Sequence, residues 1–310
     1  MCEAQRGRPG LEADEAVQGQ ALGQPMGRGP TPSHNGSMNL EFPIRSDRLR
    51  MQASVKAPVV SEKTAFQNVD IVDTDAFGRT LLLDGHIQLT EFDERAYHEA
   101  LVQIPLLNLP GARSALVVGG GDGGVIRELC RHVGMEHIEM VEIDEGVVRL
   151  CREHMPSLSA GAFDDPRVHL HIADAFPFVK NPPRSYDLIV VDSTDVYEEE
   201  QGELSEMLFT DAFYQDVRSC LNPGGVVVTQ ADNLVFCPYS LEEIRSLYAR
   251  VFARTGWYQA LVPSFGGYSG YCWGSMDRDL GPDVDVPADL GLAYLNSATL
   301  RLAFTPPRFS

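Results

Sequence analysis

Two hydrophobic patterns divide the chain at about residue 110. Before it, short runs of β-branched and aliphatic residues are separated by residues typical of turns, among them Asp75, Gly78, Asp84 and Gly85. Such spacing predicts a small antiparallel β unit, because these turn residues favour tight connections between strands. We expect its strands at 64–72, 80–83 and 86–89, and then a helix at 93–107 with Thr90 or Asp93 as its N-cap.

After residue 110, apolar runs of strand length alternate with helical patterns. The alternation predicts an α/β fold, a mostly parallel sheet with helices on both faces. Such sheets bind ligands at the carboxyl ends of their strands, near the point where the strand order reverses. We expect strands at 114–118, 137–142, 168–172, 187–192 and 225–230, helices at 123–132, 144–154, about 204–221 and 240–254, and further strands from 257 to 275.

Composition adds a tail and a strong charge to this picture. Residues 1–45 are rich in Gly, Pro, Gln and Ser, which is typical of a disordered tail, and we expect order to begin near Glu62. The formal net charge of −19 argues against nucleic acid or an anionic membrane as partner and suits a cationic small molecule, although solubility alone would also explain it. The six cysteines form no CxxC pair, and no secretory or membrane-length apolar run is seen, so we expect a cytoplasmic protein.

The most informative motif is GGGDGG at residues 119–124, between a predicted strand and a predicted helix. A glycine loop in this position lets a ligand approach the backbone at the positive end of the helix dipole. Gly119, Gly121 and Gly124 also satisfy the dinucleotide pattern G-x-G-x-x-G, so a nicotinamide-dependent dehydrogenase is an alternative. Asp122 disfavours that alternative, because its carboxylate would repel a pyrophosphate and would fit a cationic group, as in a nucleoside with a sulfonium and a terminal amine.

Acidic residues follow four successive predicted strands. They are Asp122, then Glu142 and Asp144, then Asp174, and then Asp192 and Asp195. Any one of them could instead cap a helix. Glu142 lies 20 residues after Asp122, which is the spacing of an acid that accepts from ribose hydroxyls, although its charge could also help to start the helix at Asp144. Asp174 could accept from an adenine amino group or cap a helix at 175–180.

Several segments together match one known pattern. They are 66–69 (FQNV), 83–91 (LDGHIQLTE), 93–94 (DE), 97–99 (YHE), the GGGDGG loop, 141–144 (VEID), Asp174, 186–195 (YDLIVVDSTD) and 221–225 (LNPGG). On these motifs, the chain from residue 64 onward resembles the polyamine aminopropyltransferases, the spermidine synthase family. The resemblance implies a methyltransferase-like Rossmann domain at 111–310 and a small N-terminal antiparallel β domain with its connecting helix at 46–110. The N-terminal domain would mediate assembly into a homodimer or homotetramer.

The resemblance also implies a reaction. The aminopropyl group of decarboxylated S-adenosylmethionine would be transferred to putrescine, giving spermidine and methylthioadenosine. The decarboxylated donor is a co-substrate, and no cofactor and no metal are expected. Asp122 and Asp192 would flank the donor's terminal ammonium, and Asp122 would repel the carboxylate of ordinary S-adenosylmethionine.

Residue roles follow from the same resemblance. Asp192 is the expected base, which takes a proton from the acceptor amine. Glu142 would hold the ribose and Asp174 the adenine. The donor site would comprise Gln67, Gly119, Gly121, Asp122, Glu142, Asp174 and Ala175, and the acceptor site Tyr97, His98, Asp195, Gln230 and Phe265.

Two segments depart from the family's pattern and leave the acceptor open. Segment 196–207 is acidic and longer than the family's loop, so it is either a solvated extension or a lid that recruits a longer or more cationic acceptor. Ser264 and Phe265 stand where the family usually has Thr-Tyr, and a pocket hydroxyl is lost unless Tyr268 or Tyr271 replaces it. Spermine or thermospermine synthesis, an N-methyltransferase and an inactive paralogue acting as a subunit are therefore alternatives, and the retained acids speak against the last two.

Overall fold

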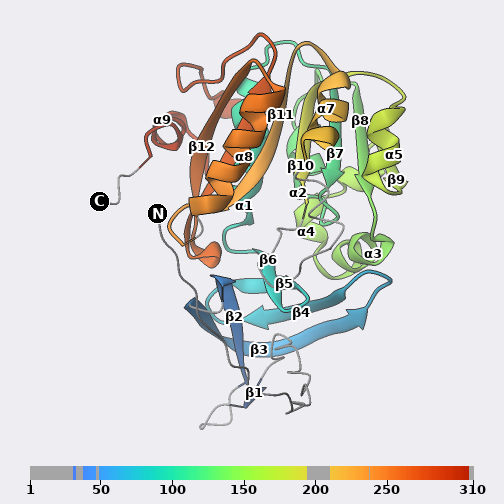
Figure 1. Cartoon of the computed structure of the whole chain (residues 1–310). Helices are drawn as coiled ribbons and strands as arrows, with labels where there is room; N and C mark the ends of the chain where they lie inside the picture. The colour runs from blue at the N-terminus through green and yellow to red at the C-terminus, as the bar shows by residue number, and fades with distance from the viewer. Residues whose placement is uncertain (1–30, 33–37, 47–48, 194–209, 237, 307–310) are drawn as a thin grey trace, which may run out of the picture.

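The chain folds into two β-sheets that lie against each other (Figure 1). A computed structural model describes residues 31–32, 38–46, 49–193, 210–236 and 238–306. The N-terminal sheet has six strands, and the second sheet has seven strands and is covered by helices. Figure 1 shows the N-terminal sheet, in blue and cyan, across one end of the larger unit.

The N-terminal sheet is an antiparallel meander in which each strand pairs with the next one along the chain. The turn residues predicted from the sequence connect its last three strands, and Asp84 and Gly85 both adopt a positive φ between two of them. Its strands are β1 (Thr31–Pro32), β2 (Met38–Ser46), β3 (Leu49–Lys63), β4 (Asn68–Thr74), β5 (Gly78–Leu83) and β6 (His86–Thr90).

The boundary predicted for the tail is wrong at its C-terminal end. Residues 38–45 belong to β2, and Leu40, Phe42 and Ile44 are buried in the core. These three residues stand at every second position, separated by Glu41 and Pro43, which is a period-2 strand signal that the surrounding Gly-rich and Pro-rich composition obscured. Order also begins before Glu62, because β3 starts at Leu49. Residues 1–30, which were also assigned to the disordered tail, lie outside the described residues.

The second sheet has the predicted α/β architecture, and the predicted fold class is confirmed. Its strand order is β12-β13-β11-β10-β7-β8-β9, with parallel pairing from β11 to β9 and antiparallel pairing of β13 and β12. The strands are β7 (Ser114–Gly119), β8 (His137–Glu142), β9 (Val168–Ile172), β10 (Tyr186–Asp192), β11 (Leu221–Asn233), β12 (Arg254–Val262) and β13 (Gly267–Ser275).

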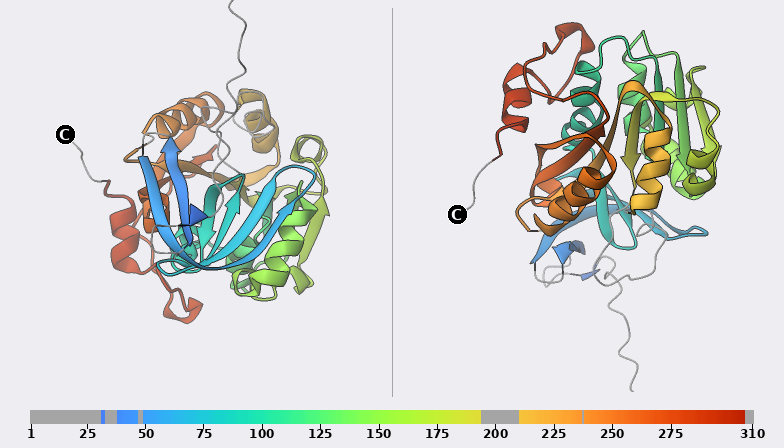
Figure 2. Two further views of the ribbon diagram at one scale, coloured as in Figure 1. Left: turned by 90° about the horizontal axis from the view of Figure 1, so that it is seen from below. Right: turned by 45° about the horizontal axis from the view of Figure 1, so that its top comes forward.

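Helices cover both faces of this sheet, as its buried strands require (Figure 2). Ala115 and Val117 of β7 face a core shared with α1 and α2, while Leu116 and Val118 face the core under α7 and α8. No helix in the described part of the chain has the length and apolar character needed to cross a membrane. The helices are α1 (Glu94–Leu107), α2 (Gly124–Cys130), α3 (Glu145–His154), α4 (Pro156–Ser159), α5 (Ala175–Lys180), α7 (Asp211–Ser219), α8 (Pro238–Val251) and α9 (Ser297–Ala303).

The two sheets are joined through α1 and α3. Helix α1 follows β6 directly but packs against α2 and β12, so by its contacts it belongs to the larger unit rather than to the predicted domain 46–110. Val147 and Leu150 of α3 share a core with Ile71 and Leu81 of the N-terminal sheet. The N-terminal sheet is thereby held against the larger unit on the side where β7 and β8 end.

Candidate active site

The strand order reverses between β7 and β10, and the predicted binding crevice lies at this point. The chain runs from β7 to β8 and β9 on one side and then returns to form β10 and β11 on the other. Asp192, the last residue of β10, pairs with Gly119, the last residue of β7. A cavity of about 400 Å³ opens here, between these strand ends and the β5–β6 hairpin of the N-terminal sheet.

The glycine loop brings β7 and β10 closer than side chains would allow. A Cβ on Gly119 would lie 2.2 Å from the backbone oxygen of Asp192, and the Gly120 N–H donates to that same oxygen at 3.0 Å. A Cβ on Gly124 would lie 2.2 Å from the His98 ring. The glycines are therefore needed for close packing of strand, helix and imidazole, and Asp122 is the one loop residue that brings a side chain to the cavity.

The cavity gathers nearly every residue predicted for the site. Eleven predicted residues besides the base Asp192 line it: Gln67, Tyr97, His98, Gly119, Gly121, Asp122, Glu142, Asp174, Ala175, Gln230 and Phe265. Asp195 and segment 196–207 lie outside the described residues. The roles assigned to these residues stay predictions, but the shared position makes one ligand site of residues that are far apart in sequence.

Two aspartates and a histidine form the polar centre of the cavity. Ligating atoms of His98, Asp122 and Asp192 all lie within 4.8 Å of one another. Asp122 Oδ1 accepts from the Gly124 N–H at 2.7 Å and lies 3.3 Å from His98 Nε2. The Tyr97 hydroxyl donates to Asp192 Oδ1 at 2.5 Å. Neighbouring groups thus hold both aspartate side chains in place.

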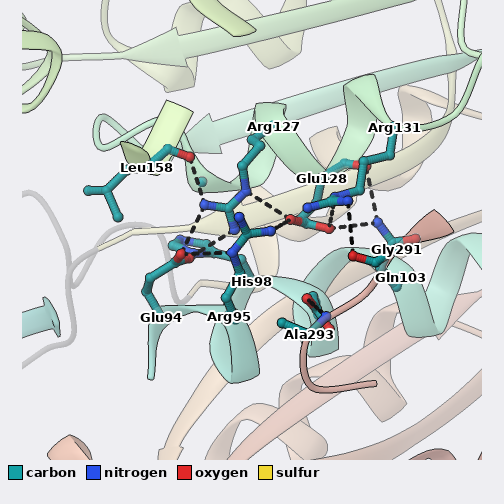
Figure 3. A network of polar contacts seen from close by, with 12 residues as sticks. Glu94, Arg95, His98, Gln103, Arg127, Glu128, Arg131, Leu158, Gly291 and Ala293 are labelled. Carbon is teal, nitrogen blue, oxygen red and sulfur yellow. Dashed lines mark hydrogen bonds and ion pairs between the residues drawn. The ribbon is translucent and has the colours of Figure 1, made fainter. Parts of the chain in front are cut away.

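His98 carries a positive charge in this arrangement. Burial opposes its protonation, but the carboxylates of Asp122 and Glu94 outweigh burial and raise the pKa of His98 to about 10. Glu94 accepts from His98 Nδ1 at 2.8 Å (Figure 3). In this protonation state both ring nitrogens donate, and the two aspartate carboxylates are the anionic groups that face the cavity.

Glu142 has the local role at the start of α3 that was considered for it, and its second oxygen lies at the glycine loop. Its Oε1 accepts from the Asp144 N–H at 2.9 Å, which is the local role at the start of α3. Its Oε2 lies beside the glycine loop, 3.1 Å from where a Cβ on Gly121 would be. Burial and the nearby Asp144 charge, opposed by backbone hydrogen bonds, raise the pKa of Glu142 to about 7.

Asp174 and Gln67 have structural partners as well as a place in the cavity wall. Asp174 Oδ1 accepts from the Phe176 N–H at 2.9 Å and so caps α5, the local alternative that was considered for it. The Gln67 amide donates to Asp144 Oδ2 at 3.0 Å. This bond ties the N-terminal sheet to the start of α3 and fixes Gln67 at the rim of the cavity.

The cavity wall beside Tyr97 is aromatic. Neither Tyr268 nor Tyr271 supplies the hydroxyl that the family usually has at position 265. Phe265 is buried, and its ring meets that of Tyr97 edge-on with 5.7 Å between centroids. Neither Tyr268 nor Tyr271 lines the cavity. Tyr271 is fully buried behind Tyr97, and its hydroxyl donates to the Tyr97 backbone oxygen at 3.5 Å. The suggestion that either one supplies the lost hydroxyl is therefore wrong.

Sequence reasoning missed the contribution of the β5–β6 hairpin to the site. Asp84, His86 and Gln88 line the cavity from the N-terminal sheet. In the sequence, Asp84 and Gly85 indicate a turn and residues 83–91 match a family motif, but no site role was assigned to them. Period-2 alternation around the turn is the local signal that His86 and Gln88 share a face. Sequence reasoning also missed Glu94, which contacts His98 from one helical turn earlier in α1.

Comparison with known proteins identifies the family of this chain. A family model described as the spermine/spermidine synthase domain matches residues 94–281, and one described as the spermidine synthase tetramerisation domain matches residues 42–91. The chain belongs to the spermine and spermidine synthase family, whose members related to it are named polyamine aminopropyltransferases. The family resemblance predicted from the sequence is thereby confirmed.

Individual relatives cover most of the chain. It is 39% identical to the polyamine aminopropyltransferase of Klebsiella pneumoniae (strain 342), over 85% of this chain and 93% of that protein. It is 44% identical to polyamine aminopropyltransferase 1 of Pseudomonas aeruginosa, over 70% of this chain and 75% of that protein. Among solved structures, a spermidine synthase in complex with the transition state analogue AdoDATO has a TM-score of 0.80 at 26% identity, covering 90% of this chain and 95% of that chain. Spermidine synthase from Thermotoga maritima has a TM-score of 0.77 at 25% identity, with coverage of 90% and 94%.

The raised pKa of Glu142 predicts a stability effect in the substrate-free protein. Because the pKa rises from 4.5 to about 7 on folding, the folded state binds more protons than the unfolded chain in this window, and stability falls as the pH rises through it. Glu142→Gln removes the titrating group and with it this pH-dependent loss of stability. The variant should gain about 1–3 kcal/mol over the wild type at pH 8.5, and the gain should shrink towards pH 5.

Urea unfolding of both proteins at the two pH values measures this difference. Glu145→Gln, which removes one charge at an exposed position of α3, is the control for net charge. A gain for Glu142→Gln that is the same at both pH values would contradict a raised pKa for this carboxyl.

Proposed function

We propose that the protein transfers the aminopropyl group of decarboxylated S-adenosylmethionine to putrescine and releases spermidine and methylthioadenosine. The observation that supports this most directly is the position of Asp122, a carboxylate at the cavity on a loop of the kind that holds phosphate in nucleotide-binding folds. A ligand with a cationic end beside a nucleoside fits this loop, and a ligand with a phosphate or carboxylate at the same place does not.

The donor would lie along the ends of β7, β8 and β9. Glu142 Oε2 lies beside the glycine loop and would accept from ribose hydroxyls, and the adenine would extend along the wall that Asp174 and Ala175 line. The aminopropyl chain would then extend towards Asp122, whose carboxylate attracts the terminal ammonium. Ordinary S-adenosylmethionine would place its carboxylate near Asp122, and like charges in a partly desolvated site repel by several kcal/mol.

The transfer itself is a displacement at carbon. A neutral acceptor nitrogen attacks the carbon bound to the sulfonium sulfur, a C–N bond forms, the C–S bond breaks, and its electron pair leaves with methylthioadenosine. The acceptor amine is protonated in water, with a pKa of about 10 for a lysine-like amine, so it must first lose a proton. Asp192 would take that proton, and its hydrogen bond with the Tyr97 hydroxyl supports this role because it fixes the orientation of the carboxylate. Alignment of nitrogen, carbon and sulfur would provide much of the remaining acceleration.

Putrescine fits the aromatic and acidic character of the acceptor side. The rings of Tyr97 and Phe265 offer an apolar wall for a short methylene chain, and Asp192 offers an anion for its amine. We propose that no cofactor and no metal take part, that the N-terminal sheet mediates assembly into a homodimer or homotetramer, and that the protein acts in the cytoplasm. The tetramerisation domain matched at residues 42–91 supports an oligomer, and the free thiols of Cys130, Cys151, Cys220 and Cys272 are consistent with a reducing compartment.

A substrate matrix tests the reaction. Purified protein is given decarboxylated or ordinary S-adenosylmethionine together with putrescine, cadaverine, agmatine or spermidine, and products are read by mass spectrometry. We expect aminopropylated putrescine with the decarboxylated donor alone. Methyl transfer from the ordinary donor would contradict the proposal, faster turnover of spermidine would indicate a spermine or thermospermine synthase, and no product from any pair would favour an inactive subunit.

The role of Asp192 predicts the effect of one substitution. Asp192→Asn should lower kcat by about 10²–10⁴-fold, because the amide accepts no proton from the acceptor amine. The fold should persist, since an amide still accepts from the Tyr97 hydroxyl.

Asp187→Asn is the matched control for this substitution. Asp187 lies at the other end of β10, outside the cavity, where it accepts from the N–H groups of Arg113 and Ser114. We expect its kcat to stay near that of the wild type. A near-normal kcat for Asp192→Asn in a folded protein would remove Asp192 as the base.

A further inference from the structure

A buried row of alternating charges runs from the interior into the cavity. Arg127 of α2 contacts Glu94 of α1, and Glu94 contacts His98 one helical turn later in the same helix (Figure 3). His98 in turn contacts Asp122 of the glycine loop. Arg127, Glu94 and His98 are all buried. Burying charges costs folding free energy unless they are paired. A row of buried charges that ends on a carboxylate in the ligand cavity therefore indicates a role in function.

Glu94 is anchored on its interior side. Arg127 donates to both of its oxygens, from Nη1 to Oε1 at 3.0 Å and from Nη2 to Oε2 at 2.8 Å, and Arg95 Nε lies 3.2 Å from Oε1. Arg127 is itself fixed by the Leu158 backbone oxygen at 2.7 Å and by Glu128 at 2.8 Å. Burial opposes the charge on Glu94, but His98 and Arg127 outweigh it and lower the pKa of Glu94 to about 2. Glu94 is therefore an anion with a fixed position.

This anion determines which nitrogens of His98 carry protons. Nδ1 faces Glu94 Oε2 at 2.8 Å and must donate to it. Nε2 is buried, lies 3.3 Å from Asp122 Oδ1 and has no well-aligned hydrogen bond to any residue in the described part of the chain. A lone pair on Nε2 would repel the Asp122 oxygen, whereas an N–H attracts it. The two carboxylates together select the imidazolium.

Within the described residues, every charged group that faces His98 favours the protonated ring. Glu94 approaches from its own helix, Asp122 from the glycine loop and Asp192 from the end of β10. Arg127 of α2 is directed at Glu94 rather than at the ring, and the side of α2 next to the ring carries Gly124. Tyr97 meets the ring edge-on at 5.2 Å between centroids.

We propose that Glu94 is a positioning residue for the transfer reaction, which holds His98 as an imidazolium so that His98 orients Asp122 towards the donor's ammonium. The proposal rests on the proposed function, because it assigns the ligand of Asp122. Both described contacts of Asp122 are on Oδ1, from the Gly124 N–H and from His98 Nε2. These contacts restrain rotation of the carboxylate and leave Oδ2 as the oxygen that would meet a ligand in the cavity.

Glu94→Gln tests the proposal through the pH dependence of the donor reaction. Without the Glu94 charge, His98 should lose its proton nearer to neutral pH, and donor binding should weaken as the imidazole becomes neutral. The ratio of variant to wild-type kcat/KM for the donor should be near one at pH 6 and fall at least tenfold by pH 9. Taking the ratio cancels titrations that both proteins share, such as that of Glu142.

Glu99→Gln is the matched control on the same helix. Glu99 is fully buried and accepts from the N–H groups of Ala293, Tyr294 and Leu295, away from His98. Its ratio to the wild type should not depend on pH, whatever its stability. A pH-independent ratio for Glu94→Gln as well would overturn the proposal, since loss of packing alone gives that result.

Nitrogen NMR of His98 in the wild-type protein gives an answer that needs no activity. The proposal predicts protons on both ring nitrogens at pH 8 without substrate, and a neutral ring at that pH would overturn it even if the variant fails to fold. A wild type that shows the doubly protonated ring but transfers no aminopropyl group would refute the proposed function and leave the charged state of His98 established.

Discussion

The close approach of the ends of β7 and β10 is the constraint on which the rest of the site depends. The backbone oxygen of Asp192 occupies the space where a Cβ on Gly119 would lie and accepts from the Gly120 N–H. Any side chain at Gly119 would force the two strands apart at the point where the sheet changes direction. Because the strands stay close, the loop that follows β7 places Asp122 in the same cavity as Asp192. Two carboxylates thereby meet at the edge where α/β sheets bind ligands.

Two like charges in a confined space need compensation, and the structure supplies it in two ways. His98 lies beside both aspartates as a cation, and the Tyr97 hydroxyl donates to Asp192. A cationic substrate would complete the balance. The charges of the two aspartates are thus partly compensated without substrate, and the site still attracts a cation, which fits the proposed donor with its sulfonium and ammonium. The net negative charge of the chain adds a long-range field that also attracts cations.

The sequence predicted the larger unit and the main acids well, because both depend on local pattern. Apolar runs and the GGGDGG loop place β7, α2 and Asp122 almost to the residue, and the topology of parallel sheets then brings Asp192 to the same edge. Strand β2 was missed because its alternation is short and lies next to a Gly-rich and Pro-rich region. The contacts of His98 with Glu94 and of Glu94 with Arg127 follow from packing between helices, which no pattern along the chain reports. Phe265 lines the cavity. The position of Tyr271 behind Tyr97 depends on tertiary packing, which the sequence pattern does not report.

The central claim is that Asp122 selects the donor by charge, and binding of two donors tests it most directly. Calorimetry would give Kd for decarboxylated and for ordinary S-adenosylmethionine with the wild type, Asp122→Asn and Asp174→Asn. Asn at position 122 can still accept from the Gly124 N–H, so the loop should keep its shape. The account predicts a wild-type preference for the decarboxylated donor that narrows at least tenfold in Asp122→Asn, whereas Asp174→Asn should weaken both ligands and keep their ratio. An unchanged ratio in Asp122→Asn would contradict the account.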